Sequence, residues 1–505
     1  MLNLQRQVST AKDFLNLNKH WAVNWPALFV AFVFAAMYFL TAIPRIFYPY
    51  DLDFVEDSML MESIRFANDQ PIFIPPSADF VPHVYMPLYS WLGGLLFKVT
   101  GPSYIPLRLL SLTATLSTSG LIYWIAWSES GLGWMGIVCA GLFLGGYRIN
   151  GFWYELVRVD ALFAMLALSG LTLGVYGVDS QRWLILSAIV LALAFFTKQT
   201  GAVFGIGLAL YLLMTIKQRA WPFVLVFSLL TIVPVILLNN LTKGWFLYYT
   251  FNLASSVNPI KIERIVDFVS FELLGLMAGL TVMTIGAGLL GIRKAGLRVI
   301  RDQPWLTWMG TAIVVSGIGR ASVGGNLNNL MPAYALLCLA PAILTREWNA
   351  QSELFDSWRT NLITMVILVQ FALGVYNPLR YIPNPAMHRG GSHLIERIAS
   401  INGKVLVLMH PYYAWLAGKE PAAQAATMWY IHERGKLALP PDFITRIKQH
   451  YYAAIISDNS EYETEPSFQQ LLNTYYKLSE TLEPSASPPT TTGVVVQPMM
   501  VYIPR

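Results

Sequence analysis

The sequence predicts an α-helical membrane protein that crosses the bilayer about eleven times and ends in a small C-terminal α/β domain outside the cytoplasm. First, 55% of the 505 residues are hydrophobic and only 12% are charged, whereas soluble domains average roughly 45–50% apolar and about 25% charged residues. Second, long apolar runs recur over the first three quarters of the chain. Third, the composition changes from about residue 393 to the end, where short strands and helices are expected to alternate.

The apolar runs have the length that a helix needs to cross roughly 30 Å of hydrocarbon, about 17–25 residues. Eleven runs qualify: 25–45, 106–127, 132–149, 159–178, 182–198, 200–217, 221–240, 270–292, 304–320, 327–345 and 360–378. A shorter run at 85–99 contains Pro87, Gly93 and Gly94. We expect it to lie in the membrane interface without crossing.

The expected orientation follows from lysine and arginine in the short loops, because these residues are more frequent in loops on the cytoplasmic side. With the N-terminus in the cytoplasm, the basic loops 216–219, 292–303 and 346–359 are all cytoplasmic. If residues 85–99 crossed the membrane, loop 292–303 would lie outside, against this rule. The long 46–105 loop and the chain end are therefore expected on the opposite side.

Three parts of the chain follow from this orientation. Residues 1–24 are a cytoplasmic N-terminal segment, and residues 25–378 form a transmembrane module whose first outer loop, 46–105, carries interfacial helices. Residues 379–505 form an extracytoplasmic α/β domain. Its expected strands are 403–410, 451–458, 475–482 and 498–505.

Acidic residues gather where the chain leaves the first apolar run, in YPYDLDFVEDSMLMESIRFAND, residues 48–69. Asp51, Asp53, Glu56, Asp57 and Glu62 fall within twelve positions of each other. A polar loop outside a membrane is often simply solvated, but positioned carboxylates can also act as general bases. Helical spacing does not select one of them, because residue 53 shares a face with both 56 and 57.

Cations form a second pattern at the expected outer ends of the apolar runs. Arg158 and Asp160 begin the fourth run, where they can pair with each other or mark a site. Arg108, Lys198 and Arg320 lie at the ends of other runs. Snorkelling explains any one of these cations. Together they could bind an anionic head group, because arginine and lysine bind phosphate well.

Carboxylates and cations on one membrane face suit a transfer reaction on a lipid-phosphate donor. A carboxylate would take a proton from an acceptor hydroxyl, and cations would stabilise the departing phosphate. A polytopic transporter or lipid flippase is an alternative, although it would show inverted repeats and charges at mid-depth. A non-catalytic subunit of a polysaccharide assembly system is another, and it would tolerate loss of the acids.

The order of these motifs resembles the GT-C class of polyprenyl-phosphate-dependent glycosyltransferases. The likeness is to bacterial relatives of protein O-mannosyltransferases and aminoarabinose lipid A transferases. It rests on the acidic stretch, Y-x-P-L-Y at 85–89, Arg108-Leu-Leu-Ser, Arg158-Val-Asp160 and FFTKQTG at 195–201, and it covers roughly residues 25–345.

The resemblance implies an inverting glycosyltransferase with a catalytic carboxylate in the first outer loop. Relatives commonly have Asp-Glu where this chain has Glu56-Asp57, which leaves the base open among Glu56, Asp57 and Asp53, preferred in that order. A second acidic residue of the class matches Asp160, which would orient the acceptor. The expected substrate-binding residues are Arg158, Lys198, Arg320, Arg108, Tyr154, Tyr85 and Asn326.

The resemblance also implies the partners and the location. The donor would be a sugar on a polyprenyl phosphate, and the acceptor a glycan, lipid or protein; no nucleic acid is expected. We expect no cofactor, with Mg²⁺ or Mn²⁺ on the acidic cluster as the disfavoured option. The protein would be a multi-pass protein of a bacterial plasma membrane.

Overall fold

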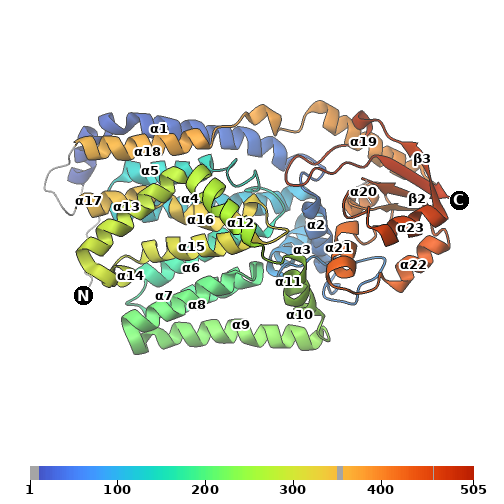
Figure 1. Ribbon diagram of the computed structural model, residues 1–505, viewed down its shortest axis with the longest axis horizontal. Helices are drawn as coiled ribbons and strands as arrows, with labels where there is room; N and C mark the ends of the chain where they lie inside the picture. The colour runs from blue at the N-terminus through green and yellow to red at the C-terminus, as the bar shows by residue number, and fades with distance from the viewer. Residues whose placement is uncertain (1–10, 350–356, 459) are drawn as a thin grey trace.

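The computed structural model describes residues 11–349, 357–458 and 460–505. A bundle of long helices forms one end of an elongated molecule, and the C-terminal helices and strands form the other (Figure 1). Ten residues of the predicted N-terminal segment, 1–10, and residues 350–356 of one predicted cytoplasmic loop lie outside the described residues.

Each of the eleven predicted apolar runs falls on helical residues, but fewer helices qualify as membrane spans. Within the described ranges, six segments are long and apolar enough, and a bent pair, Ile262–Leu276 with Ala278–Ala295, would make a seventh. The six are Asn24–Ile46, Tyr104–Ser130, Val159–Tyr176, Gly201–Leu241, Leu327–Trp348 and Trp358–Arg380. The predicted count of about eleven is therefore not confirmed.

The difference in count comes mainly from helix length. Helix α5 (Gly133–Gly145) has 13 residues and α7 (Gln181–Thr197) has 17, near or below the lower limit for a span. Helices α8 (Gly201–Ile216) and α9 (Trp221–Leu241) count as one segment, although Figure 1 shows them running side by side. The number of crossings stays a prediction.

The helices of the bundle differ in how much of their surface is covered by protein. In an apolar 18-residue window of the Leu327–Trp348 segment 89% of the residues are buried, whereas the corresponding window of Gly201–Leu241 has only 11% buried, and α9 exposes Leu225, Leu229 and Ile236. An apolar face of this size needs an apolar surrounding. The bundle therefore has one central segment and an outer pair of helices suited to lipid.

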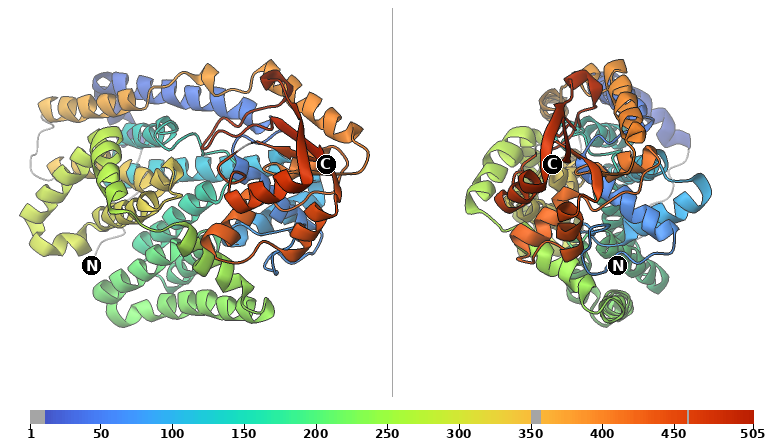
Figure 2. Two further views of the ribbon diagram at one scale, coloured as in Figure 1. Left: turned by 45° about the vertical axis from the view of Figure 1, so that its right-hand side comes forward. Right: turned by 90° about the vertical axis from the view of Figure 1, so that its right-hand side faces the viewer.

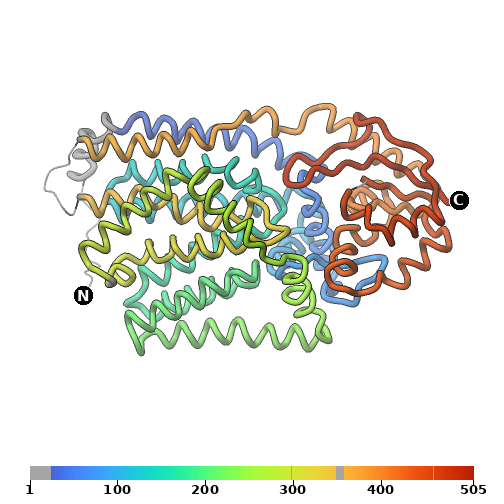
Figure 3. The backbone as a smooth tube through the Cα atoms, in the orientation of Figure 1, coloured from blue at the N-terminus to red at the C-terminus, as the bar shows by residue number. Residues whose placement is uncertain are grey.

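Two helices of the first loop connect the bundle to the C-terminal region, residues 379–505. Helix α2 (Phe54–Ala67) begins at Asp53, whose side chain caps it by accepting from the Val55 amide. Helix α3 (Leu88–Thr100) packs on α2 through Gly93, where a Cβ would lie 2.4 Å from the Ser63 hydroxyl. Figure 3 shows this part of the chain between the bundle and the C-terminal region.

The C-terminal region contains the four predicted strands. They form one mixed sheet in the order β1-β2-β4-β3, in which β1 and β2 are parallel and the other pairs are antiparallel. The strands are β1 (Lys404–Val407), β2 (Tyr452–Ser457), β3 (Tyr476–Thr481) and β4 (Met500–Pro504).

Helices surround this sheet, namely α19 (Pro385–Ser400), α20 (Pro411–Leu416), α21 (Ala425–Trp429), α22 (Pro441–Lys448) and α23 (Pro466–Tyr475). The end-on view in Figure 2 shows these elements in front of one end of the bundle. Gln424 donates to the Phe54 carbonyl at the start of α2. The C-terminal region therefore packs directly on the predicted acidic loop, and its independence as a domain stays a prediction.

Candidate functional site

Glu56, the first-ranked candidate base, is fully buried and fully hydrogen-bonded. Its Oε1 accepts from Arg108 Nε at 2.9 Å and from the Val157 amide at 2.8 Å. Its Oε2 accepts from Arg108 Nη2 and from the Leu52 amide, both at 2.7 Å. A carboxylate offers about four lone-pair positions. The geometry therefore leaves no oxygen position for an acceptor hydroxyl and gives Glu56 a structural role.

Arg108 is occupied in the same way. Besides its two bonds to Glu56, its guanidinium donates to the carbonyls of Arg45, Tyr48 and Tyr50 at 2.8, 2.6 and 2.8 Å. A guanidinium has five N–H groups, and five bonds are made here. Contrary to the expectation from the sequence, Arg108 has no donor left for a phosphate. Arg108 thereby holds the C-terminal end of α1 (Ala11–Ile46) and the residues that follow it against α4 (Tyr104–Ser130).

A second buried ion pair lies beside the first and was not predicted. Arg45, in the last turn of α1, donates from Nε to Glu155 at 2.5 Å, and the Tyr147 hydroxyl donates to the same oxygen at 2.5 Å. Arg45 Nη2 also donates to Thr492 at 2.9 Å. The pair therefore joins α1, the 146–158 loop and the C-terminal region. The sequence signal that could have indicated this pair is an arginine at the end of one apolar run and a glutamate just before another.

Tyr154, an expected substrate-binding residue, lies in the packed core instead. Its hydroxyl donates to the Phe143 carbonyl at 2.9 Å and accepts from Asn150 Nδ2 at 3.0 Å. Its ring stacks on Phe143 with centroids 4.9 Å apart. Because both functions of the hydroxyl are used and the ring is buried, Tyr154 has no group facing a site.

Asp53 is the carboxylate that contacts an expected phosphate-binding cation. Its Oδ2 accepts from Trp153 Nε1 at 2.5 Å, and Arg158 Nη1 lies 3.3 Å from its Oδ1. Arg158 Nη2 donates to the Tyr85 hydroxyl at 2.9 Å. Burial raises the pKa of Asp53, and the Arg158 charge offsets part of that rise. A carboxylate with a raised pKa is a stronger base near neutral pH.

Asp160 holds two of the expected cations in place. It begins α6 (Val159–Tyr176), and its Oδ1 accepts from Lys198 Nζ at 2.7 Å. Its Oδ2 accepts from Asn328 Nδ2 at 2.9 Å and lies 3.8 Å from Arg158 Nε. Lys198, just after α7, also donates to Asn329 at 2.9 Å. We call Asp53, Arg158, Asp160 and Lys198 the charge row.

The remaining expected residues of this region lie outside the charge row's hydrogen bonds. Arg320 pairs with Glu272 and also donates to the Gly325 carbonyl. Asn326 caps the short helix η5 (Leu327–Leu330), accepting from the Leu327 amide. The asparagines that reach the charge row are the next two in the same Asn-Leu-Asn-Asn sequence. The sequence shows all three asparagines, but the conformation of η5 decides which of them bond to the charge row.

Asp57 lies deeper, between α4 and α20. It accepts from the Tyr104 hydroxyl at 3.0 Å and from the Tyr412 amide at 3.1 Å. Burial holds the pKa of Asp57 well above its ordinary value, with the nearby Asp51 carboxylate adding to the effect. Asp57 therefore has the raised pKa that a general base needs, but none of its hydrogen bonds comes from a cation of the charge row.

Asp51 belongs to a buried triad that sequence reasoning did not identify. His410 Nδ1 lies 2.9 Å from Asp51 and its Nε2 lies 2.8 Å from Asp458, while the Tyr413 hydroxyl donates to Asp51 at 2.5 Å. Burial would lower the pKa of His410, but the Asp458 and Asp51 charges outweigh it and hold that pKa well above its ordinary value. His410 and Asp458 follow the parallel strands β1 and β2, so the triad ties that sheet edge to the first loop.

Comparison with known proteins shows what the chain is similar to in sequence and in fold. Residues 81–238 match the family model described as dolichyl-phosphate-mannose-protein mannosyltransferase. No curated protein matches the chain in sequence. Among solved structures, ArnT from Cupriavidus metallidurans bound to undecaprenyl phosphate has a TM-score of 0.58 at 12% identity, with 98% of each chain covered.

A second solved structure is the Archaeoglobus fulgidus oligosaccharyltransferase in complex with Zn and sulfate. It has a TM-score of 0.50 at 11% identity over 93% of this chain and 73% of that chain. The protein therefore has the fold of the GT-C membrane glycosyltransferases, and the resemblance read from the motifs is confirmed. More particularly, residues 81–238 are the part of the chain that matches the mannosyltransferase family model, and the apolar helices support a multi-pass membrane protein.

Proposed function

We propose that this protein transfers a sugar from a polyprenyl-phosphate donor to an acceptor hydroxyl on the extracytoplasmic side of the membrane. The charge row is the observation that carries the proposal. It begins with Asp53, a buried carboxylate of raised pKa, and ends at Lys198, the most exposed side chain of the four at 13%. The fold similarity to ArnT bound to undecaprenyl phosphate supports the donor class.

The proposed reaction is a single displacement. The acceptor oxygen forms a bond to the anomeric carbon while its proton passes to Asp53. The bond from that carbon to the phosphate oxygen breaks, and the polyprenyl phosphate leaves with the electron pair. Arg158 and Lys198 stabilise the charge that develops on the phosphate. One displacement inverts the anomeric configuration.

This assignment reverses the order expected from the sequence. Asp53 comes first because it alone of the three candidate bases is in direct contact with a cation of the charge row. Asp57 comes second, and Glu56 is last because Arg108 holds both of its oxygens at 2.9 and 2.7 Å, whereas Arg158 lies 3.3 and 3.4 Å from the two oxygens of Asp53. Asp160 is a positioning residue in this proposal, since its oxygens hold Lys198, Asn328 and Arg158.

His83 and Tyr85 lie beside the row and are available to the sugar. The His83 ring stacks on Tyr85 with centroids 4.6 Å apart. Burial, with the Arg158 charge adding to it, lowers the pKa of His83 to about 3, so the ring is neutral. Neither ring nitrogen has a hydrogen-bond partner within the part of the chain that the structure describes. A sugar hydroxyl would satisfy them.

The proposed orientation is the one that the basic loops predict, with the N-terminus in the cytoplasm and the charge row outside. The proposed location, a bacterial plasma membrane, is the one that the family resemblance implies. The C-terminal region covers the first loop and would take part in binding a glycan, lipid or protein acceptor. No cofactor is assigned to the reaction.

The test is turnover of radiolabelled polyprenyl-phosphate sugars by the protein in lipid nanodiscs, for wild type and Asp53→Asn. Asparagine keeps the helix cap, so the fold is preserved while the base is lost. We expect turnover to fall by about 10²–10⁴. The matched control is Asp69→Asn, because Asp69 is exposed and pairs only with the exposed Lys98 among the described residues.

The pH profile provides a second readout. Because the base must be ionised, kcat/KM should rise with pH through the pKa of Asp53. That rise should lie above the ordinary aspartate value of about 3.9, since burial raises this pKa. Full turnover in Asp53→Asn would remove Asp53 as the base. Movement of the labelled lipid across the bilayer without sugar transfer would favour the transporter alternative.

A further inference from the structure

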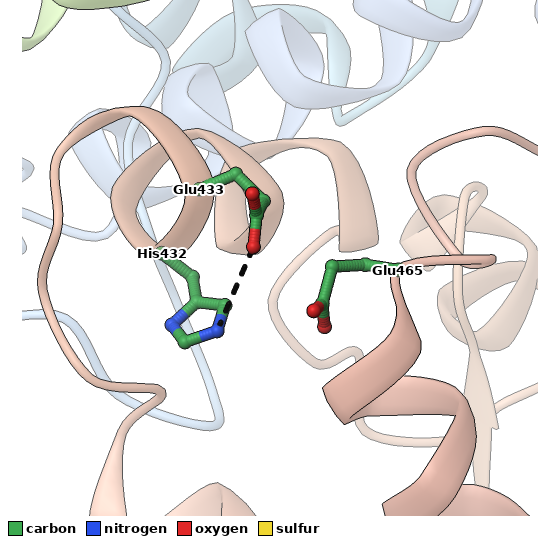
Figure 4. A group of neighbouring side chains, drawn as sticks. All are labelled: His432, Glu433 and Glu465. Carbon is green, nitrogen blue, oxygen red and sulfur yellow. Dashed lines mark ion pairs between the residues drawn. The ribbon is translucent and has the colours of Figure 1, made fainter.

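A separate cluster of possible metal ligands lies in the C-terminal region, away from the charge row. His432 and Glu433 belong to one turn, η7 (Tyr430–Arg434), and Glu465 immediately precedes α23. One ligand atom from each of the three lies within 4.8 Å of the others. Figure 4 shows the three side-chain ends turned toward a common space.

The hydrogen bonds of His432 leave one ring nitrogen available as a ligand. Its Nδ1 lies 2.9 Å from the Leu437 carbonyl, which can only accept, so Nδ1 carries a proton. In the neutral ring Nε2 then presents a lone pair. Ser467 Oγ lies 3.2 Å from Nε2, but this hydroxyl donates its single hydrogen to Glu465 Oε2 at 2.5 Å.

This arrangement is the one that metal-binding histidines use. A carbonyl or carboxylate accepts from one ring nitrogen, which fixes the tautomer and directs the other nitrogen at the ion. The bond to Leu437 lies outside the three-residue cluster, so it is independent of the ligand distances. It therefore adds a second observation that points to a metal.

The two carboxylates supply the charge that a divalent cation needs. Glu433 Oε1 lies 3.9 Å from His432 Nε2. Glu465 Oε1 accepts from the Ser467 amide at 2.9 Å and its Oε2 accepts from the Phe468 amide at 2.8 Å, which fixes this carboxylate at the start of α23. The N-terminus of α23 repels a cation with a partial charge of about +0.5. The two carboxylates together attract the cation more strongly than this charge repels it.

The cluster also borders a cavity. A small cavity of about 20 Å³, room for about one water molecule, is lined by His432 and Glu465. Its other lining is mainly apolar and includes Trp429, Phe443 and Phe468. An ion on the cluster would thus have three protein ligands and an open side at the polar edge of an apolar pocket. Three protein ligands with an open position are typical of exchangeable zinc sites.

We propose that His432, Glu433 and Glu465 bind a divalent transition-metal ion of the zinc class at the edge of this pocket. One imidazole and two carboxylates favour Zn²⁺ or Co²⁺ over Mg²⁺ or Ca²⁺, which take oxygen ligands. The open position would receive a water molecule or another small oxygen donor. The site is independent of the charge row and of the transfer reaction.

The experiment is a Co²⁺ titration of the full-length protein in nanodiscs after chelator treatment, followed by the visible absorption of bound Co²⁺ and by competition with Zn²⁺. The variants are His432→Ala, Glu433→Gln and Glu465→Gln. The matched control changes His393→Ala together with Glu396→Gln, an exposed pair three residues apart on α19. Folding of each variant is checked by its apparent Tm without metal.

We expect each cluster variant to bind Co²⁺ at least ~10-fold more weakly, as even outer-shell losses do, while the control binds as wild type. Zn²⁺ should displace Co²⁺ and should raise Tm in wild type and control only, because a ligand that binds the folded state stabilises it. Equal binding by all variants would mean an adventitious ion only and would overturn the proposal. Displacement by Mg²⁺ as readily as by Zn²⁺ would overturn the assigned metal class.

Discussion

Glu56 and Arg108 form a bidentate ion pair in which both side chains are completely buried, with Arg108 Nη2 and Nε 2.7 and 2.9 Å from the two carboxylate oxygens. The pair joins the first turn of α2 to the first turns of α4. Every other polar position of both groups is bonded to backbone. Two residues expected to do chemistry therefore anchor the loop that carries the candidate base.

The first prediction concerns this pair. Glu56→Ala should lower stability by about 3–5 kcal/mol, because removing one partner leaves Arg108 buried without its counter-charge. The apparent Tm in detergent should fall accordingly. The exposed Lys98–Asp69 pair is the control, and its removal by Asp69→Ala should cost about 0–1 kcal/mol. A folded Glu56→Ala protein of wild-type Tm that lacks turnover would instead restore Glu56 as the base.

The second prediction concerns the other end of the charge row. Lys198→Met should reduce kcat/KM for a polyprenyl-phosphate sugar by about 10²–10³, the usual loss when one group that stabilises developing charge is removed. Lys243→Met is a suitable control, because Lys243 is an exposed cation of the next predicted outer loop. An equal loss in both variants would indicate that net positive charge, and not this position, matters.

The third prediction uses the buried carboxyl of Glu62. This group accepts from the His83 amide at 2.8 Å and the Ser90 hydroxyl at 2.7 Å, and burial raises its pKa to about 7. The folded protein therefore holds this proton more tightly than the unfolded chain does. Stability from Glu62 is present below the unfolded value of about 4.3 and is lost as pH rises through about 7.

The measurement is Tm against pH for wild type and Glu62→Gln, since glutamine keeps the shape without the proton. Wild type should lose on the order of 3 kcal/mol relative to the variant between pH 4 and pH 8. Parallel curves for the two proteins would show that Glu62 does not titrate in this range.

The fourth prediction tests the triad that joins the sheet to the first loop. His410→Asn leaves the Asp51 and Asp458 carboxylates buried without their shared cation, so stability should fall by about 3–5 kcal/mol. The double change His410→Asn with Asp458→Asn should recover part of the loss, because one of the two charges is gone. The exposed His393→Asn is the control. A single variant as stable as the control would show that the triad does not hold the C-terminal region in place.

The helices and strands were largely predictable because their signals are local. Each of the eleven apolar runs is helical, and the four strands lie within their predicted segments. The helical spacing considered from residue 53 is present in the structure, because α2 begins there. Periodicity and capping depend on residues a few positions apart, so a single sequence carries them. The number of spans was less predictable, because several helices are short or bent.

The roles of the acidic residues were decided only by the tertiary structure. The sequence by itself determined that carboxylates gather after the first apolar run and that cations end several others. It did not determine that Arg108 saturates Glu56, that Asp51 meets His410 from 359 positions away, or that Asn328 and not Asn326 reaches Asp160. A hydrogen bond depends on where two distant segments are brought by packing. Since each carboxylate bonds to the donors that packing brings to it, packing alone decides which of these carboxylates contacts Arg158 and which contacts Arg108.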